Sequence, residues 1–246
     1  MGQRVFLAGA TGAVGQRLLP LLRAAGHAVY GTTRRADRAA ALEAAGATPL
    51  VLDVFDAPAL TRALAACRPQ VVLHQLTDLP PALDPAQLPA ALVRNARLRD
   101  EGTRNLVAAA IAGGARRFIA QSIAWVYSSG PKPHGEDDPL DEQATGPRGV
   151  TVAGVVALER QTLASPPLEG LVLRYGQFYG PGTGFAAPGK LAPLHVDAAA
   201  WAALLAMERG RPGIYNVAEE HPYLLTDKAR SELGWDAGFR LPTAPA

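Results

Sequence analysis

The sequence predicts an α/β protein built on a doubly wound parallel sheet. Short apolar runs with β-type residues alternate with longer segments of Ala, Leu and Arg at helical spacing, which is typical of strands joined by crossover helices. A cluster of glycines follows the first apolar run directly, at residues 9–15. In such a fold, ligands bind in the crevice beyond the carboxyl ends of the strands, so we expect the functional residues to gather there.

The predicted elements follow one another in strand and helix order. The first strand is the run Val-Phe-Leu-Ala, and the first helix is the Leu-rich segment after the glycines. In the first half, strands are predicted at 5–8, 28–32, 49–52, 71–75 and 117–121, separated by helices at 14–25, 36–45, 57–66 and 90–112. In the second half, helices at 151–164, 197–209 and 226–233 alternate with strands at 171–174 and 214–217.

The glycine cluster is a dinucleotide-binding signal. Gly9, Gly12 and Gly15 are spaced by three residues each, behind a strand and at the start of a helix. Each has a physical reason: a tight turn, close approach of the backbone to a pyrophosphate, and packing of helix against sheet. Because the spacing alone is a weak signal, the interpretation depends on this strand and helix context. The pattern predicts a Rossmann fold.

Two arginines follow the second predicted strand, where an acidic residue would bind the 2′-hydroxyl of NAD. Arg34 and Arg35 stand at that point instead, and a guanidinium pairs with a 2′-phosphate in a charge-assisted geometry. We therefore expect NADP(H) as the preferred cofactor, with NAD(H) as the alternative and Arg34 as the better candidate of the two. The competing interpretation is that both arginines are solvated at a helix start.

Residues 128–149 are predicted to form a long loop, because they are rich in Gly, Pro and acids and lack helical or strand periodicity. Loops of this length are often functional lids. The acidic cluster in this loop has one His and no ligand spacing, so no metal site is predicted. We expect a dinucleotide-binding core over 1–165, completed by strands near 169–175 and 213–217, and a substrate-binding region formed by 128–149 and a small C-terminal part, 181–246.

Further motifs resemble the extended and atypical branch of the short-chain dehydrogenase/reductase superfamily, the NAD-dependent epimerase/dehydratase family. The resemblance extends over nearly the whole chain and is more specific than the glycines alone. Besides the glycine turn, it includes residues 52–54, 74–77, 102–106, 126–127, 173–182, 195–197 and 213–217.

The resemblance implies a role for several of these segments. Asp53 and Val54 would meet the adenine, the segment ending at Thr77 would line the cofactor ribose, and the residues after the sixth strand would cover the nicotinamide. The predicted cofactor-binding residues are Gly9, Thr11, Gly12, Ala13, Val14, Gly15, Arg34, Arg35, Asp53, Val54, Gln75, Leu76, Thr77, Gln121, Tyr175, Gly176, Gln177 and Phe178.

The chain departs from this family where the family's proton donor stands. Dehydrogenases and epimerases of the family use a Tyr-x-x-x-Lys pair, whereas none of the six tyrosines here has a lysine four residues later. Aligned on the following helix, the two positions fall on Thr151 and Val155. The family's Asn three residues before Gly-Thr is Arg99. These differences predict an atypical active site.

The family's substrate-binding Ser or Thr falls on Ile123, and Ser122 lies one residue earlier. A slip of one residue reverses the face of a strand, so Ser122 takes this role only if the strand end is irregular. Hydride transfer does not strictly require the Tyr-Lys pair, but the protein must still provide a proton, so a substitute acid must exist. The candidates are Tyr127, Tyr175, His195 and His134, each of which has a competing structural interpretation as a packing aromatic, a helix cap or an exposed loop residue.

We therefore predict an NADP(H)-binding enzyme, an oxidoreductase that acts on a small, fairly apolar carbonyl or imine substrate with a non-standard proton donor. Two alternatives remain open at this point. One is a redox-neutral isomerase, lyase or cyclase that works by positioning a reactive substrate. The other is a non-catalytic NADP(H) sensor. Few basic residues occur in the substrate region, which argues against a nucleotide-sugar substrate.

Composition limits the classes of partner and the cellular compartment that we expect for the protein. Lys plus Arg (24) exceed Asp plus Glu (22) by two, which does not favour nucleic acid as a partner. One cysteine, Cys67, forms no internal disulfide, and the N-terminus shows no signal peptide. Every apolar stretch is shorter than a membrane span requires. We expect a cytoplasmic protein without membrane partners; a homodimer through the long helices and intramolecular packing of their Ala-rich faces are equally consistent with the sequence.

Overall fold

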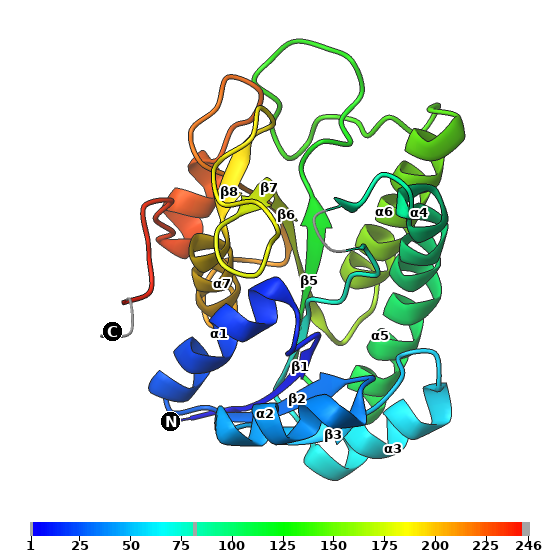
Figure 1. The fold of residues 1–246 in the computed structure, drawn as a ribbon, viewed down its shortest axis with the longest axis vertical. Helices are drawn as coiled ribbons and strands as arrows, with labels where there is room; N and C mark the ends of the chain where they lie inside the picture. Colours follow the sequence, from blue (N-terminus) through cyan, green and yellow to red (C-terminus); the bar gives the residue numbers. More distant parts are fainter. Residues whose placement is uncertain (1, 81–82, 243–246) are drawn as a thin grey trace.

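A seven-stranded parallel sheet forms the centre of the molecule (Figure 1). The computed structural model describes residues 2–80 and 83–242. The strand order is β3-β2-β1-β4-β5-β6-β9, in which the chain runs outward from β1 to β3 and then returns to β4 on the other side of β1. This reversal confirms the doubly wound fold. The strands are β1 (Arg4–Ala8), β2 (Ala28–Thr33), β3 (Thr48–Val51), β4 (Val71–His74), β5 (Arg117–Ile123), β6 (Glu169–Tyr175) and β9 (Gly213–Val217).

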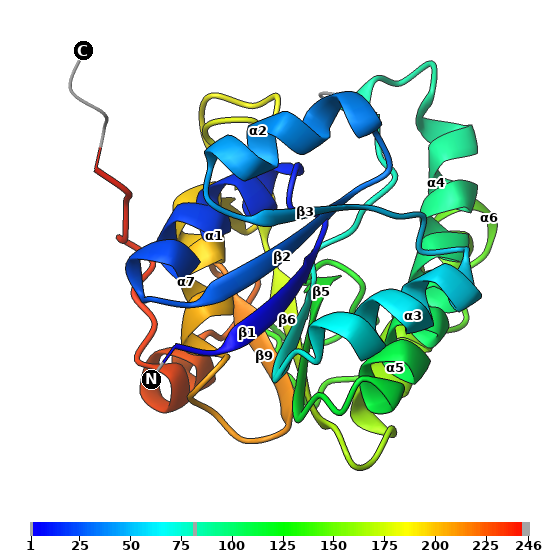
Figure 2. The ribbon, with the colours of Figure 1, turned by 90° about the horizontal axis from the view of Figure 1, so that it is seen from below.

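Helices cover both faces of this sheet (Figure 2). On one face, α1, α2 and α7 pack their leucines and alanines against the strands. On the other face, α3, α5 and α6 do the same, and α4 packs against α6. The bounds are α1 (Ala13–Ala24), α2 (Ala39–Ala44), α3 (Ala57–Cys67), α4 (Leu88–Arg97), α5 (Thr103–Ala112), α6 (Gly146–Leu163) and α7 (Val196–Leu205), with a short η1 (Ala36–Arg38) before α2 and η4 (Ala229–Leu233) near the end.

The central strands are buried on both faces because helices cover them from both sides. All seven residues of β5 and all four of β4 are buried, which explains why neither strand shows an alternation of apolar and polar residues. Within the described ranges, no helix combines the length and apolarity that a membrane crossing requires.

The structure differs from the predicted helix at 90–112, which is divided into three parts. Between α4 and α5 lies η3 (Leu98–Gly102), a π-helical turn. A π turn inserts one residue into the helical repeat and rotates the residues that follow it. The helical spacing of the sequence does not reveal a single inserted residue, so one continuous helix was the natural prediction.

Two other differences concern segments beyond the strand ends. Helix α6 begins at Gly146, five residues before the predicted start, and has Pro147 in its first turn, a position that suits proline. The second is an unpredicted pair of short parallel strands, β7 (Gln177–Tyr179) and β8 (Pro193–His195). Strands of three residues are too short to show an alternating pattern.

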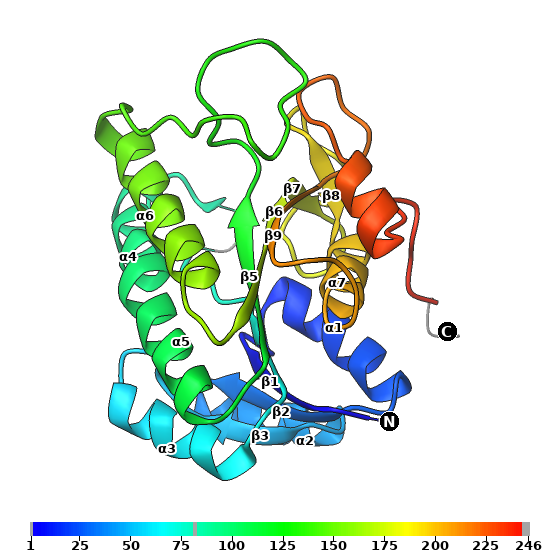
Figure 3. The ribbon, with the colours of Figure 1, turned by 180° about the vertical axis from the view of Figure 1, so that it is seen from behind.

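The long loop between β5 and α6 lies above the carboxyl ends of the strands, beside the segment that follows β9 (Figure 3). The backbone N–H of His134 donates to the carbonyl of Tyr223, and the N–H of Leu225 donates to the carbonyl of His134. The two segments predicted to bind substrate therefore contact one another. Their division from the dinucleotide-binding core stays a prediction.

Candidate functional site

The turn between β1 and α1 is built from glycines at backbone contact distance. Gly9 has a φ of +90°, and a Cβ on it would lie 2.7 Å from the carbonyl oxygen of Gln75. A Cβ on Gly15 would lie 2.1 Å from the carbonyl oxygen of Gly9. Gly12 is the N-cap of α1, which has neither a side-chain cap nor an acidic residue in its first turn. The N–H groups at this helix end suit the binding of a phosphate.

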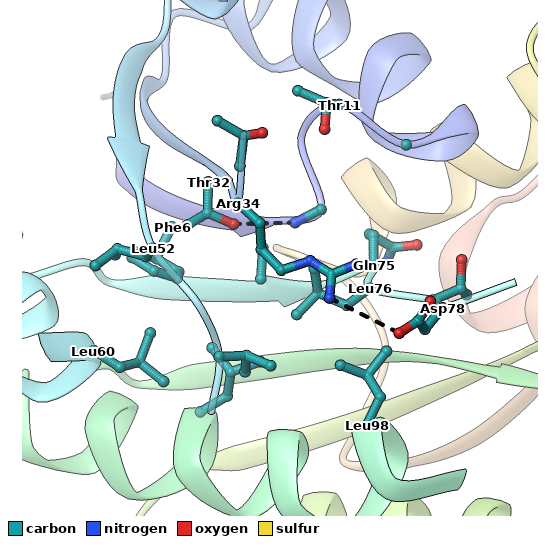
Figure 4. Close-up of a pocket in the computed structure, with 17 residues that line it drawn as sticks. Phe6, Thr11, Thr32, Arg34, Leu52, Leu60, Gln75, Leu76, Asp78 and Leu98 are labelled. Atoms are coloured by element: carbon teal, nitrogen blue, oxygen red, sulfur yellow. Dashed lines mark hydrogen bonds and ion pairs between the residues drawn. The ribbon is translucent and has the colours of Figure 1, made fainter. Parts of the chain in front are cut away.

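A pocket opens beside this turn, at the carboxyl ends of β1, β2 and β4 (Figure 4). The glycine turn with Thr11 borders it on one side, and Leu98 of η3 borders it on the other. Its lining brings together these residues of the predicted cofactor set: Gly9, Thr11, Gly12, Arg34, Val54, Gln75, Leu76 and Thr77.

Other residues of the predicted set lie outside this pocket lining. Gly15 and Val14 are buried in α1, and Asp53 accepts a hydrogen bond from the N–H of Phe55. Arg35 is directed at Asp37, to which it donates two hydrogen bonds. The lining of this pocket also does not include Ala13, Gln121, Tyr175, Gly176, Gln177 and Phe178. Their cofactor contacts remain predictions.

Sequence reasoning missed several residues of the pocket wall. Leu60, Leu98 and Leu106 come from α3, η3 and α5, and Asp78 follows β4. The three leucines read as ordinary core residues of their helices, because the sequence does not show which part of the core faces a cavity. Asp78 directly follows the segment 74–77. This position was the only sequence signal that could have identified it as a residue of the pocket wall.

Arg34 lies at the mouth of the pocket. Its Nη1 is 3.8 Å from Oδ2 of Asp78, and Nε of Arg94 is 3.6 Å from the same oxygen. The side chain of Arg34 is 56% exposed, so this ion pair is weak and a stronger anion can replace it. The residue before Arg34, at the end of β2, is Thr33 and not an acidic residue. The pocket wall thus presents an exposed cation at the end of β2.

Gln75 provides a test of whether the pocket fits a dinucleotide. Both polar atoms of its side-chain amide are buried, and no described residue forms a hydrogen bond of good geometry with either. The phenol of Tyr175 lies close to this amide, whose effect on the pKa of Tyr175 opposes that of burial. Leaving a buried amide unpaired costs about 1–3 kcal/mol. A nicotinamide dinucleotide has hydroxyl and carboxamide groups, and a ligand with such groups would satisfy both atoms. Together with the glycine turn, this orphaned amide fits NAD(P).

Ser122, the first candidate catalytic residue, belongs to a buried ion-pair cluster. Its Oγ donates to Oε1 of Glu159 at 2.7 Å. Arg174 donates to the same carboxylate through Nε (2.9 Å) and Nη2 (2.7 Å). Strand β5 pairs regularly with β6 up to Ile123 and Tyr175, so the irregular strand end that a catalytic Ser122 requires does not occur. Its catalytic role stays a prediction.

Tyr127 extends the same cluster toward β9. Its hydroxyl donates to Oδ1 of Asn216 at 2.6 Å and accepts from Nη1 of Arg174 at 2.9 Å. Burial raises the pKa of Tyr127 to about 12, although the charge of Arg174 opposes the shift. His134, the loop histidine, stacks on its ring with centroids 5.0 Å apart. A phenol with these partners is a poor proton donor at neutral pH.

Tyr175 and His195 also have structural partners. The hydroxyl of Tyr175 is buried and donates to the carbonyl of Ala199 at 3.2 Å, and burial raises the pKa of Tyr175. His195 caps α7, since its Nδ1 accepts from the N–H of Asp197 at 3.1 Å. Burial, and then the charge of Arg240, lower the pKa of His195. The neutral imidazole therefore carries its proton on Nε2. The catalytic roles of both residues stay predictions.

The positions aligned with the missing pair lie on α6. Thr151 donates its hydroxyl to the carbonyl of Pro147 at 3.0 Å. Val155 is fully buried in an apolar cluster with Ile123 and Val126. Across the described ranges, no group of three or more His, Cys, Asp and Glu side chains is placed to hold a metal ion.

Comparison with known proteins is consistent with a dinucleotide site. Residues 9–146 match a family model described as NAD(P)H-binding. A 3-diazoavenalumate denitrifying reductase from a Streptomyces species is 43% identical, over 89% of this chain and 77% of that protein. A dTDP-4-dehydrorhamnose reductase from Streptomyces griseus is 33% identical, over 73% of this chain and 51% of that protein.

Solved structures share the fold at lower identity. A UDP-glucose 4-epimerase from Thermotoga maritima, solved with UDP-glucose, superposes with a TM-score of 0.77 at 19% identity, covering 96% of this chain and 94% of that one. The UDP-glucose 4-epimerase from Bifidobacterium longum, in complex with NAD+ and UDP, has a TM-score of 0.76 at 16% identity, with coverage of 96% and 94%.

Proposed function

The chain belongs to the NAD(P)H-binding proteins of the short-chain dehydrogenase/reductase type, and from this membership we propose that it is an NADPH-dependent reductase that replaces the diazo group of an anionic aromatic compound with hydrogen. The observation that carries the proposal is the 43% identity, over 89% of the chain, to a reductase named for the denitrification of a diazo compound. The ending of that substrate's name denotes an anion. Aromatic diazonium ions persist in water long enough to serve as substrates, whereas aliphatic ones do not.

The chemistry of this reaction supports the proposal, because it needs no proton from the protein. When bound, NADPH supplies a hydride to the ring carbon that carries the nitrogen. The new C–H bond takes the electron pair of the hydride, and the C–N bond breaks with its own pair on the leaving N₂. An aryl diazonium ion and NADPH thus give the arene, N₂ and NADP⁺, and the equation balances without a proton.

The contacts of three of the candidate residues also favour this reaction over carbonyl or imine reduction. A carbonyl oxygen must be protonated as the hydride arrives. Ser122 donates to Glu159, Tyr127 to Asn216 and Tyr175 to a main-chain carbonyl. The sequence also has no Tyr-x-x-x-Lys pair to replace them. A substrate that accepts the hydride and loses neutral N₂ needs no proton from these groups.

Residues of the chain would bind and orient the cofactor. The N–H groups around Gly12 would hold the pyrophosphate, Val54 would contact the adenine, and Gln75 would pair its orphaned amide with the ribose or carboxamide. Arg34 would exchange its weak partner Asp78 for the 2′-phosphate, which is the basis for proposing NADPH over NADH. The residues after β6 would border the nicotinamide, and the loop after β5 would cover the substrate.

The test uses freshly prepared 3-diazoniocinnamate with NADPH that is deuterated at C4. We expect cinnamate with deuterium at ring carbon 3, one N₂ per NADPH consumed, and no deuterium at that carbon when unlabelled NADPH is used in D₂O. The Gly12→Val variant, whose side chain would occupy the pyrophosphate position, gives the uncatalysed background. A rate equal to that background, or faster reduction of cinnamaldehyde than of the diazonium ion, would contradict the proposal.

A further inference from the structure

Arg99 is an almost fully buried arginine without a partner. It lies in η3, the π turn that packs against α6, and is only 6% exposed. Among the residues that the structure describes, none accepts a hydrogen bond from its guanidinium, and no carboxylate lies within ion-pair distance. π turns inside helices often occur at functional sites.

The neighbouring charges leave Arg99 uncompensated. Glu159 is the acid that acts on it, but the carboxylate of Glu159 already pairs with Arg174. His74 is also close enough to feel this charge, and it is neutral, since burial, and then the charge of Arg99, lower the pKa of His74 to about 4. Burial lowers the pKa of Arg99 itself to about 10, so the guanidinium is protonated at neutral pH. The site therefore holds one positive charge in excess.

An arginine that is 6% exposed has lost most of its hydration, and no hydrogen bond or ion pair to a described residue compensates for that loss. Its position indicates what the partner is. Leu98, the preceding residue, lines the dinucleotide pocket, and His74 directly precedes Gln75 of the same pocket. Arg99 itself is not part of the pocket lining; it lies beside that lining, on the turn that packs against α6. The anionic groups of NADPH already have the glycine turn and Arg34 as proposed partners, which leaves the substrate as the source of an anion for Arg99.

We propose that Arg99 binds the carboxylate of the substrate and selects anionic aromatic compounds. Its planar guanidinium can take a carboxylate in a two-point, charge-assisted geometry. The inference rests on the proposed function for the identity of the substrate. It gives Arg99 a binding and specificity role, with no part in the hydride step.

The test compares cinnamate with cinnamamide, its neutral counterpart of nearly the same shape. Both are titrated calorimetrically into the protein saturated with NADP⁺, so that no turnover is needed. We expect the wild type to favour cinnamate by at least about 10-fold, as expected for a charge-assisted pair. Arg99→Met should bring this ratio close to one, and Arg99→Lys should retain part of it. Arg104→Met, which removes an exposed arginine of the neighbouring helix α5, should keep the wild-type ratio.

A thermal melt of the ligand-free protein tests the same idea without any ligand. Because Arg99 is unpaired there, Arg99→Met should melt at the wild-type temperature or above it. An unchanged cinnamate ratio in Arg99→Met, or an equal loss of affinity for NADP⁺ and cinnamate, would overturn the inference. The two proposals fail separately: loss of the ratio without any diazonium reduction would refute the proposed function alone, whereas diazonium reduction with an unchanged ratio would refute only the role of Arg99.

Discussion

Replacing Arg34 with alanine should cost affinity for NADPH while leaving affinity for NADH unchanged. The guanidinium is 56% exposed and 3.8 Å from Asp78, so losing that ion pair changes the free energy by no more than about 1 kcal/mol. A charge-assisted bond to a 2′-phosphate contributes about 1.5–3 kcal/mol. Since about 1.4 kcal/mol is a factor of ten, the dissociation constant for NADPH should rise roughly 10- to 150-fold.

Arg35→Ala is the matched control for this experiment. Arg35 neighbours Arg34 in sequence and carries the same charge, but it is directed at Asp37 and not at the pocket. Its removal should change the dissociation constant for NADPH by less than about threefold, the effect of a distant, screened charge.

The assay is a fluorescence titration of each variant with NADPH and NADH at low and moderate salt. The effect of Arg34→Ala on NADPH should shrink as salt rises, because the contact is at the surface. Equal losses for the two dinucleotides would refute the reasoning, since only NADPH carries the 2′-phosphate. A larger loss in Arg35→Ala than in Arg34→Ala would also refute it.

Three further predictions test the neighbouring geometry. Asp78→Asn removes the carboxylate that competes with the 2′-phosphate, so titration should show NADPH binding up to about fivefold more tightly, worth up to ~1 kcal/mol, with NADH unchanged. Gly15→Ala places a Cβ 2.1 Å from the carbonyl oxygen of Gly9 and should cost about 3 kcal/mol in urea unfolding, whereas Gly130→Ala, which meets nothing closer than 3.8 Å, should be nearly neutral. Because the pKa of His74 is lowered to about 4, the unfolded state binds more protons than the folded state between pH 4 and 6.5. The free energy of unfolding should therefore fall with decreasing pH in that window, by up to about 3 kcal/mol more than in His74→Gln. The same pH dependence of the unfolding free energy in both proteins would contradict this.

The dinucleotide-binding part of the fold could largely be predicted from the sequence, because its sequence motifs are local. The glycine turn depends on residues within one strand and one helix, and Gly9 indeed has the positive φ that a glycine provides. The predicted doubly wound parallel sheet and the NAD(P)-binding family are confirmed. Arg34 lies in the pocket wall and Arg35 outside it, a distinction that depends on the direction in which the chain leaves β2.

The region proposed to bind substrate was harder to predict from the sequence, because its contacts join distant parts of the chain. Ser122 meets Glu159, which is 37 residues away, and Tyr127 meets Asn216, which is 89 residues away. No pattern within either segment identifies such partners. The orientation of Arg99 depends in addition on the π turn of η3, a one-residue insertion that helical periodicity does not reveal.

The buried cluster around Arg174 relates the absence of a Tyr-x-x-x-Lys motif from the sequence to the architecture of the region proposed to bind substrate. Arg174 joins Glu159 of α6 to the hydroxyl of Tyr127, and it also donates to the carbonyl of Glu136 in the loop above the strands. The side chain of Glu136 in turn accepts from the N–H of Asn216 in β9. Polar groups with two or three fixed partners hold the loop in place, and they are not free to exchange protons with a substrate. A reaction whose leaving group is neutral nitrogen tolerates this arrangement, because the protein must then hold the substrate and the cofactor in register and has no proton to deliver.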